Sequence, residues 1–256
     1  MLRKGDLTQG GITGTLLHFT LPMMVGSFLQ QCYNIADTLI VGQCIGAGAL
    51  AAVGSAYTLM VFLISVLLGL AMGSGTVFSL HYGAGNHVAL RRSIFSSFVL
   101  IGIVTLILNV AVFIWLDPIL RLLQVPQDIY GMMRSYSWII FCGIVFTFIY
   151  NFYASLLRAV GDSVTPLWFL AVSVVLNIAL DLFFILQLDW GIQGAASATV
   201  LAQGVAALGI IIYTYRRRPE LRWHHEDMCF DRTCLKEIAS FSTLTCVQQS
   251  VMNLGI

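Results

Sequence analysis

Charged side chains are scarce in this sequence. Of its 256 residues, 13 are Lys or Arg and 12 are Asp or Glu, which makes 10% charged residues against 58% hydrophobic ones. A soluble domain carries roughly 25% charged residues. The composition therefore excludes an ordinary soluble domain and indicates a protein of the lipid bilayer. The net charge is only +1, and nucleic acid is not expected among the partners.

Cysteine and histidine form no pattern that predicts a disulfide framework or a metal site. The six cysteines are scattered, and Cys44 is the only one expected outside the cell. His224, His225, Cys229 and Cys234 share one hydrophilic segment, but their spacing fits no zinc motif. A signal-peptide pattern is also lacking, because the first apolar stretch has the length of a membrane span and no small-residue cleavage motif. We expect no bound cofactor.

Long apolar runs dominate what is present. A helix needs about 20 mostly apolar residues to cross the hydrocarbon core. Six runs in the sequence meet this requirement, and a seventh begins near Glu237 and reaches Ile256. We therefore expect an all-α polytopic membrane protein: a six-helix transmembrane lobe over 1–215, a cytoplasmic linker over 216–236, and the truncated start of a second lobe over 237–256. The six expected spans are 15–41, 50–81, 94–116, 133–157, 166–188 and 192–215.

The basic residues predict the orientation of these spans. Lys and Arg near span ends are retained on the cytoplasmic side. Eleven of them fall on one side, namely Arg3, Lys4, Arg91, Arg92, Arg158, Arg216, Arg217, Arg218, Arg222, Arg232 and Lys236, and only Arg121 and Arg134 fall on the other. The sequence thus predicts a cytoplasmic amino terminus in the cytoplasmic (inner) membrane.

Two short segments of similar sequence indicate an internal repeat. Leu29-Gln30-Gln31-Cys32 is followed closely by Asn34, and Val247-Gln248-Gln249-Ser250 is followed closely by Asn253. Six spans separate the two copies, so both enter the membrane in the same direction, as in transporters built from parallel halves. We therefore expect this chain to be half of a pseudo-twofold, twelve-helix transporter.

Two aspartates lie inside otherwise apolar helices. Gln30, Asn34 and Asp37 follow one face of the first span, and Asn177 lies one helical turn before Asp181 in the fifth. Both acids lie toward the outer ends of their spans, at the level that Thr199 of the sixth span and Tyr136 of the fourth can also reach. These oxygen donors make up the predicted cation or proton site, which consists of Asp37, Asn177, Asp181, Thr199 and Tyr136.

Acids inside a membrane are costly and persist mainly where they pair, face a cavity or carry ions. Two carboxylates in a weakly hydrated pocket repel each other, so the pair tends to bind a proton or a cation. Oxygen ligands suit hard cations. The alternative is that the polar side chains only hold neighbouring helices together. For Gly69 and Gly73, whose spacing permits close helix approach, packing is the expected role.

Six segments, taken in order along the chain, carry a family resemblance. They are YNIADTLIVG (33–42), GALAAVG (48–54), GAGN (83–86), LRAVGDSVTP (157–166), LNIALD (176–181) and GAASAT (194–199). The set resembles the multidrug and toxic compound extrusion transporters, especially their prokaryotic branches. The resemblance implies export of organic cations, drugs or other amphipathic compounds in exchange for protons or sodium ions, by two six-helix lobes.

The same resemblance implies a cation site in this first lobe at Asp37, Asn177 and Asp181, with Thr199 and Tyr136 as neighbours. The expected partners are a small-molecule substrate, the lipid bilayer and a missing second lobe, and no enzymatic activity is expected. A lipid-linked precursor flippase of the same superfamily is the main alternative, although no basic residue lies well inside a span. An intramembrane aspartyl protease is a weaker one, because neither aspartate stands in the sequence motifs of those enzymes.

Overall fold

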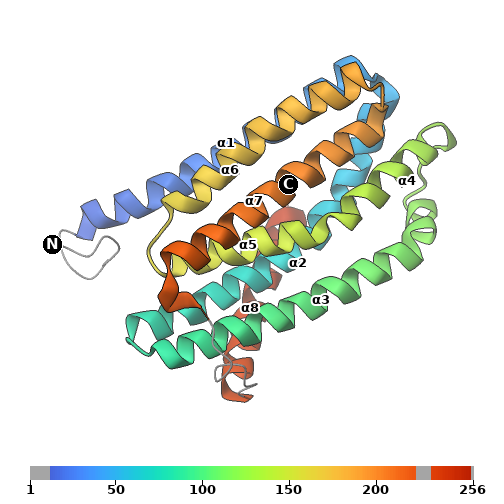
Figure 1. Ribbon diagram of the computed structural model, residues 1–256. Helices are drawn as coiled ribbons and strands as arrows, with labels where there is room; N and C mark the ends of the chain where they lie inside the picture. Colours follow the sequence, from blue (N-terminus) through green and yellow to red (C-terminus); the bar gives the residue numbers. More distant parts are fainter. Residues whose placement is uncertain (1–11, 223–231, 255–256) are drawn as a thin grey trace.

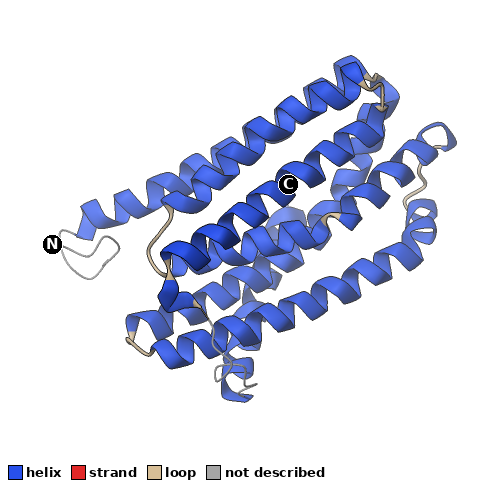
Figure 2. Ribbon diagram, in the orientation of Figure 1, coloured by secondary structure: helices blue, strands red, loops and turns tan. Residues whose placement is uncertain are grey.

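Every described part of the chain with regular structure is helical. The computed structural model describes residues 12–222 and 232–254, and Figures 1 and 2 show long helices lying side by side with short turns at their ends. The elements are α1 (Ile12–Cys44), α2 (Ala47–Gly83), α3 (His87–Leu122), α4 (Gln127–Cys142), α5 (Ile144–Ala159), α6 (Val164–Leu182), the π-helical η1 (Phe183–Gln187), α7 (Gly191–Arg217), the 3₁₀ turn η2 (Pro219–Leu221) and α8 (Arg232–Leu254).

The predicted all-α membrane fold is confirmed. Within the described residues, α2, α3, α6 with η1, and α7 are each long and apolar enough to cross a membrane, and α4 with α5 makes a fifth span if the bent pair counts as one. α1 and α8 are not among these candidates. With 33 residues, α1 is nonetheless about 50 Å long at 1.5 Å per residue, which exceeds the thickness of the hydrocarbon core.

The fourth expected span, 133–157, is in fact two helices that meet at Gly143 with a bend of 46°. Glycine is required here by a close neighbour, because a Cβ at this position would lie 2.8 Å from Cγ1 of Val200 on α7. Asn109 of α3 donates a 2.8 Å hydrogen bond to the Phe141 carbonyl beside the bend. The bend therefore lets α4 and α5 follow α7 closely, and Asn109 supplies a partner for a carbonyl near the break.

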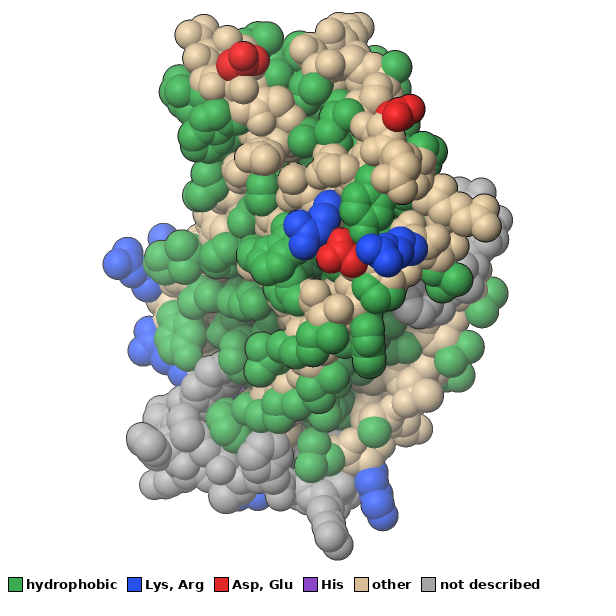
Figure 3. Space-filling model, turned by 90° about the vertical axis from the view of Figure 1, so that its right-hand side faces the viewer, with side chains coloured by type: hydrophobic (Ala, Val, Ile, Leu, Met, Phe, Trp, Pro, Cys, Tyr) green, Lys and Arg blue, Asp and Glu red, His purple; other side chains and the backbone are tan. Residues whose placement is uncertain are grey.

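Aromatic side chains fill the centre of the bundle. Phe78, Phe98, Phe148 and Phe152 come from α2, α3 and α5, and their rings meet at centroid distances of 5.3–6.0 Å. Many large apolar side chains on the outer faces are exposed instead, such as Ile114 at 66% and Val175 at 69%. On the face shown in Figure 3, hydrophobic side chains cover much of the surface and charged ones are few. Exposed apolar faces of this kind suit contact with lipid.

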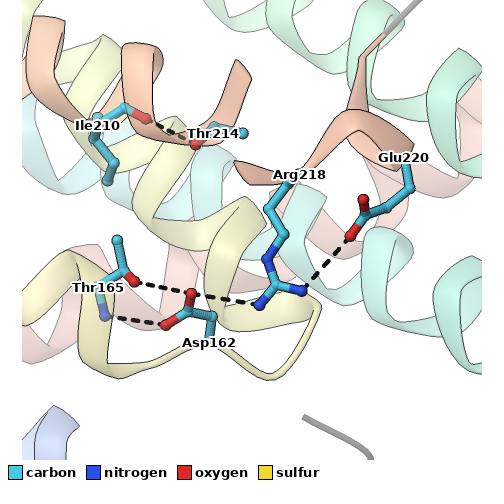
Figure 4. A network of polar contacts seen from close by, with 6 residues as sticks. All are labelled: Asp162, Thr165, Ile210, Thr214, Arg218 and Glu220. Atoms are coloured by element: carbon cyan, nitrogen blue, oxygen red, sulfur yellow. Dashed lines mark hydrogen bonds and ion pairs between the residues drawn. The ribbon is translucent and has the colours of Figure 1, made fainter. Parts of the chain in front are cut away.

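At one end of the bundle, a polar network fixes the end of α7 to the turn between α5 and α6 (Figure 4). Asp162 accepts hydrogen bonds from the backbone and hydroxyl of Thr165, at 3.0 and 2.9 Å, and so supplies a partner for a backbone N–H in the first turn of α6. Arg218 reaches Asp162 at 3.5 Å and Glu220 at 3.6 Å. Just beyond, Leu221 is buried. The first residues after α7 are thereby held against the lobe.

The predicted linker over 216–236 is partly helical at both ends. α7 continues to Arg217, and α8 already begins at Arg232. Residues 223–231, which include His224, His225 and Cys229, lie outside the described part of the chain. The domain boundaries drawn from composition therefore stay a prediction, and the described helix ends narrow the non-helical part of the linker.

α8 lies along α2. Glu237 of α8 lies 3.6 Å from Nε2 of His81 near the end of α2, and Ile238 packs with Val77 in a small apolar cluster. Farther along, Gly69 and Gly73 face α8 with almost no space between the helices. Close packing at this glycine pair, expected from its spacing, is confirmed.

Candidate cation site

α1 carries the first acid of the site. Asp37 is only 8% exposed, although α1 exposes large apolar side chains such as Ile35 and Leu39 on other faces. The predicted polar stripe is not buried as a unit. Gln30 is exposed and Asn34 is partly buried, with its amide donating to Gln31 at 3.2 Å. Asp37 is therefore the one member of that stripe that reaches the interior.

α6 carries the second acid together with its amide neighbour. Asn177 and Asp181 are 1% and 0% exposed, and their spacing places both on one face of the helix. In the orientation that satisfies both amide atoms, Asn177 Nδ2 donates to Asp181 Oδ2 at 3.0 Å, and its oxygen accepts from the backbone N–H of Thr199 at 3.2 Å. Asn177 thus joins α6 to α7 and orients the carboxyl group of Asp181.

The two acids meet across the interface between α1 and α6. The carboxyl groups of Asp37 and Asp181 are close enough to share a hydrogen bond, which two carboxyl groups can form only when a proton lies between them. On each acid, Oδ1 is buried and has no hydrogen-bond partner in the described part of the chain. An unpaired buried carboxylate oxygen is costly. A proton or a small cation held between the acids would remove that cost.

Hydroxyl groups complete the site. Thr199 of α7 is 8% exposed, and its Oγ1 lies 3.3 Å from the hydroxyl of Tyr33 on α1. Tyr136 of α4 is 5% exposed and lies in the same region of the bundle as both acids and Tyr33. The structure therefore brings together all five residues predicted for the site, from four different helices. Their role in binding a cation stays a prediction.

Tyr33 is the residue that sequence reasoning missed. It lies one turn before Asp37 on α1, at a spacing that places both on the same side of the helix. A tyrosine beside a membrane acid gives little signal by itself, because aromatic residues are common in spans. The π-helical turn over Phe183–Gln187, directly after α6, was also not expected. Such turns occur often at functional sites.

The donor set favours hard cations or protons. It contains two carboxyl groups, one amide and hydroxyl groups, all of which bind through oxygen. Within residues 12–222 and 232–254, no group of three or more His, Cys, Asp or Glu is placed to hold a metal ion. The site thus differs in chemistry from the nitrogen and sulfur sites that hold zinc.

Comparison with known proteins identifies the class. The family model MatE matches residues 22–183, a range that includes Tyr33, Asp37, Tyr136, Asn177 and Asp181 of the site. The chain is 36% identical over 217 residues to the probable multidrug resistance protein YpnP of Bacillus subtilis, covering 85% of this chain and 49% of that protein. It is 31% identical over 210 residues to the multidrug export protein MepA of Staphylococcus saprophyticus, covering 79% of this chain and 45% of that protein.

A solved structure supports the fold independently. The outward-facing conformation of a multidrug resistance MATE family transporter of the MOP superfamily matches with a TM-score of 0.91 at 24% identity, covering 99% of this chain and 56% of that one. The fold is thus that of a polytopic membrane transporter. This chain belongs to the MatE family, a family of transporters rather than enzymes. It spans about half the length of the curated relatives it matches.

Proposed function

We propose that this chain is the amino-terminal lobe of a cation-coupled antiporter that exports organic cations, drugs or other amphipathic compounds by alternating access. One observation carries the proposal: Asp37 and Asp181, from helices far apart in sequence, meet inside the lobe with buried, unpaired oxygens. The curated relatives support the export of drugs, since their names describe multidrug resistance and multidrug export.

The site suits an ion that binds from outside and leaves toward the cytoplasm. Uptake of one proton or sodium ion removes one of the two negative charges of the acid pair, and with it the repulsion between Asp37 of α1 and Asp181 of α6. The ion gradient can drive export only if the ion and the exported compound each bind one conformation more tightly than the other. α1 is the natural moving element, because Pro22 interrupts its hydrogen-bond ladder. The coupling ion thus acts through the position of α1.

The proposed arrangement places a second six-helix lobe after the linker. The similar solved structure and the curated relatives are each about twice as long as the aligned part of this chain, which supports a second lobe of comparable size. The gathering of arginine residues at one end of the bundle supports a cytoplasmic amino terminus in the cytoplasmic membrane. Arg91, Arg92, Arg158 and Arg218 all lie near the end where α2, α5 and α7 finish.

The proposal is tested by gradient-driven efflux. The full-length transporter, meaning this chain continued by its second lobe, is reconstituted into vesicles with an imposed proton or sodium gradient. Asp37→Asn and Asp181→Asn each keep the size of the side chain but remove the titratable group. We expect both variants to lose gradient-driven efflux of a fluorescent organic cation. The gradient that drives the unmodified protein identifies the coupling ion.

The matched control is Asp128→Asn, because Asp128 is an exposed acid in the first turn of α4 and lies outside the site. This variant is expected to transport like the unmodified protein. Full efflux by Asp37→Asn and Asp181→Asn, at equal membrane levels, would reduce the two acids to packing residues. Gradient-independent movement of a lipid-linked diphosphate, without efflux of the organic cation, would favour the flippase alternative.

A further inference from the structure

The turn that joins α6 to α7 is wound more widely than an α-helix. Directly after α6, the N–H of Leu188 donates to the carbonyl of Phe183 at 3.3 Å, and this hydrogen bond belongs to the π-helical turn over Phe183–Gln187. The N–H of Trp190 then reaches the carbonyl of Phe184 at 3.1 Å, and α7 begins at the following residue. The chain therefore reverses between two adjacent helices (Figure 1) through a turn that is held by its own backbone hydrogen bonds.

Side chains of this turn pack directly against the start of α7. The rings of Phe184 and Trp190 stack with their centroids 5.1 Å apart and 24° between their planes. A Cβ added to Gly194, in the first turn of α7, would lie 3.0 Å from Cβ of Phe184 and 3.3 Å from its carbonyl carbon. Those two atoms move only with the backbone. A larger residue at Gly194 would therefore push the two helices apart at this level.

The contact at the turn lies close to the cation site along both helices. Asp181 is three residues before Phe184, and Thr199 is five residues after Gly194, which is about 5–8 Å along each helix axis at 1.5 Å per residue. The hydrogen bond from the N–H of Thr199 to Asn177 measures 3.2 Å. This length is already at the upper end of the usual range, so a shift of α7 along α6 by less than about 1 Å would break it.

α6 and α7 also meet on the other side of the site, toward the start of α6. There the ring of Phe169 lies 6.1 Å from the ring of Tyr213, and a Cβ added to Gly209 would lie 2.6 Å from Cε1 of Phe169. A ring atom can move away by a change of rotamer, whereas Phe184 presents Cβ and backbone atoms to Gly194. The contact at the turn is therefore the firmer of the two, and it lies closer to the second acid.

We propose that the turn between α6 and α7 is a positioning element of the cation site. Through the contacts of Phe184 with Trp190 and Gly194, it fixes the register of α7 on α6. That register holds Thr199 where it can bind Asn177, and Asn177 in turn orients the second acid. The three residues of the turn are thus positioning residues that act on the ion through Asn177. This inference rests on the proposed function, because the binding of a coupling ion belongs to that proposal.

The test removes the stacked ring. Trp190 is 52% exposed, so Trp190→Ala leaves little void in the lobe. In the full-length transporter, efflux of a fluorescent organic cation is followed over a series of proton and of sodium concentrations. The ion concentration for half-maximal efflux is expected to rise about threefold to tenfold, the size that the loss of one aromatic pair allows. The maximal turnover should be kept, because both acids are still present. Trp190→Phe retains a ring and should restore the unmodified value.

The matched control is Tyr213→Ala, which removes the other aromatic pair between the same two helices. This variant is expected to keep the unmodified ion dependence. Equal shifts in Trp190→Ala and Tyr213→Ala would overturn the proposal, because general packing of α6 on α7 would then explain both. An unchanged ion dependence in Trp190→Ala, at equal membrane levels, would overturn it as well. Failure of the proposed function gives a different result, namely no gradient-driven efflux by the unmodified protein.

A double variant tests the route through Asn177. If the turn acts by holding Thr199 at Asn177, Trp190→Ala should have no further effect on the ion dependence once Asn177→Ala has removed that contact. Additive shifts in the double variant would mean that Trp190 acts elsewhere, and the proposal would fail.

Gly194→Ala approaches the same contact from the side of α7. The added methyl group presses on Phe184, so the ion concentration for half-maximal efflux is expected to rise as in Trp190→Ala. Gly54→Ala is the control, because a Cβ at Gly54 would meet no atom within 4 Å. The same ion dependence in both glycine variants would contradict a positioning role for the contact between Gly194 and Phe184.

Discussion

Asn177 donates a 3.0 Å hydrogen bond to Asp181 from one helical turn away, and its carbonyl accepts from the backbone of Thr199. A fully buried amide thereby holds one acid of the pair in place while it bridges α6 and α7. The carboxyl group of Asp37 has no corresponding amide in the described part of the chain. The two acids therefore differ in how they are held: Asp181 is oriented by an amide on its own helix, and Asp37 has no such partner among the described residues.

Asn177→Ala is expected to weaken ion binding without abolishing it. A hydrogen bond to a charged group contributes roughly 1.5–3 kcal/mol, which corresponds to a loss of about tenfold to a hundredfold in affinity. The measurement is the proton or sodium concentration that gives half-maximal efflux. Asn151→Ala is the control, because Asn151 donates to the Thr147 carbonyl on its own helix at 2.8 Å and lies outside the site. Equal shifts in both variants would argue against an orienting role for Asn177.

Gly143→Ala is expected to destabilise the lobe by about 1–3 kcal/mol, since the new methyl group would overpack against Val200. The measurement is thermal unfolding in detergent. Val200→Ala in the same chain removes the two methyl groups that cause the collision and should recover part of the loss. A double variant no more stable than Gly143→Ala alone would place the cost in the backbone bend instead of in the contact with α7.

Arg218→Gln is expected to release the segment after α7. Arg218 joins Asp162 to Glu220 while its side chain is 23% exposed, so solvent screening limits the loss to about 1 kcal/mol or less. Hydrogen exchange of residues 218–222 should become faster, and the rest of α7 should be unchanged. Arg216→Gln, an exposed position nearby on the same helix, is the control. Unaltered exchange in Arg218→Gln would show that other contacts fix this segment, namely the burial of Leu221 and the hydrogen bond from Arg222 to the Tyr215 carbonyl.

The sequence predicted the helices well because apolar length is a strong signal. It also predicted which residues meet at the site, since Asn177 and Asp181 share a helical face and Asp37 is an acid in an apolar run. The bend at Gly143 was not predicted, because it depends on the close approach of Val200 from a helix distant in sequence. Tyr33 was missed for a similar reason: its contact with Thr199 exists only once α1 lies beside α7.

The orientation of the bundle is open to a chemical test with Cys44. This cysteine is exposed at the end of α1, on the side that carries only two of the thirteen basic residues and is therefore expected to face outward. In a background with no other cysteine, a membrane-impermeant maleimide added to intact cells should label Cys44. Ala84→Cys, placed in the same background without Cys44, is the control, because Ala84 is exposed in the turn between α2 and α3 at the opposite end. That cysteine should react only after the cells are opened.

The reverse labelling pattern would invert the predicted topology, and with it the direction in which the acid pair takes up its ion. Labelling of both positions in intact cells would show that the reagent had crossed the membrane, and the experiment would then need a larger probe.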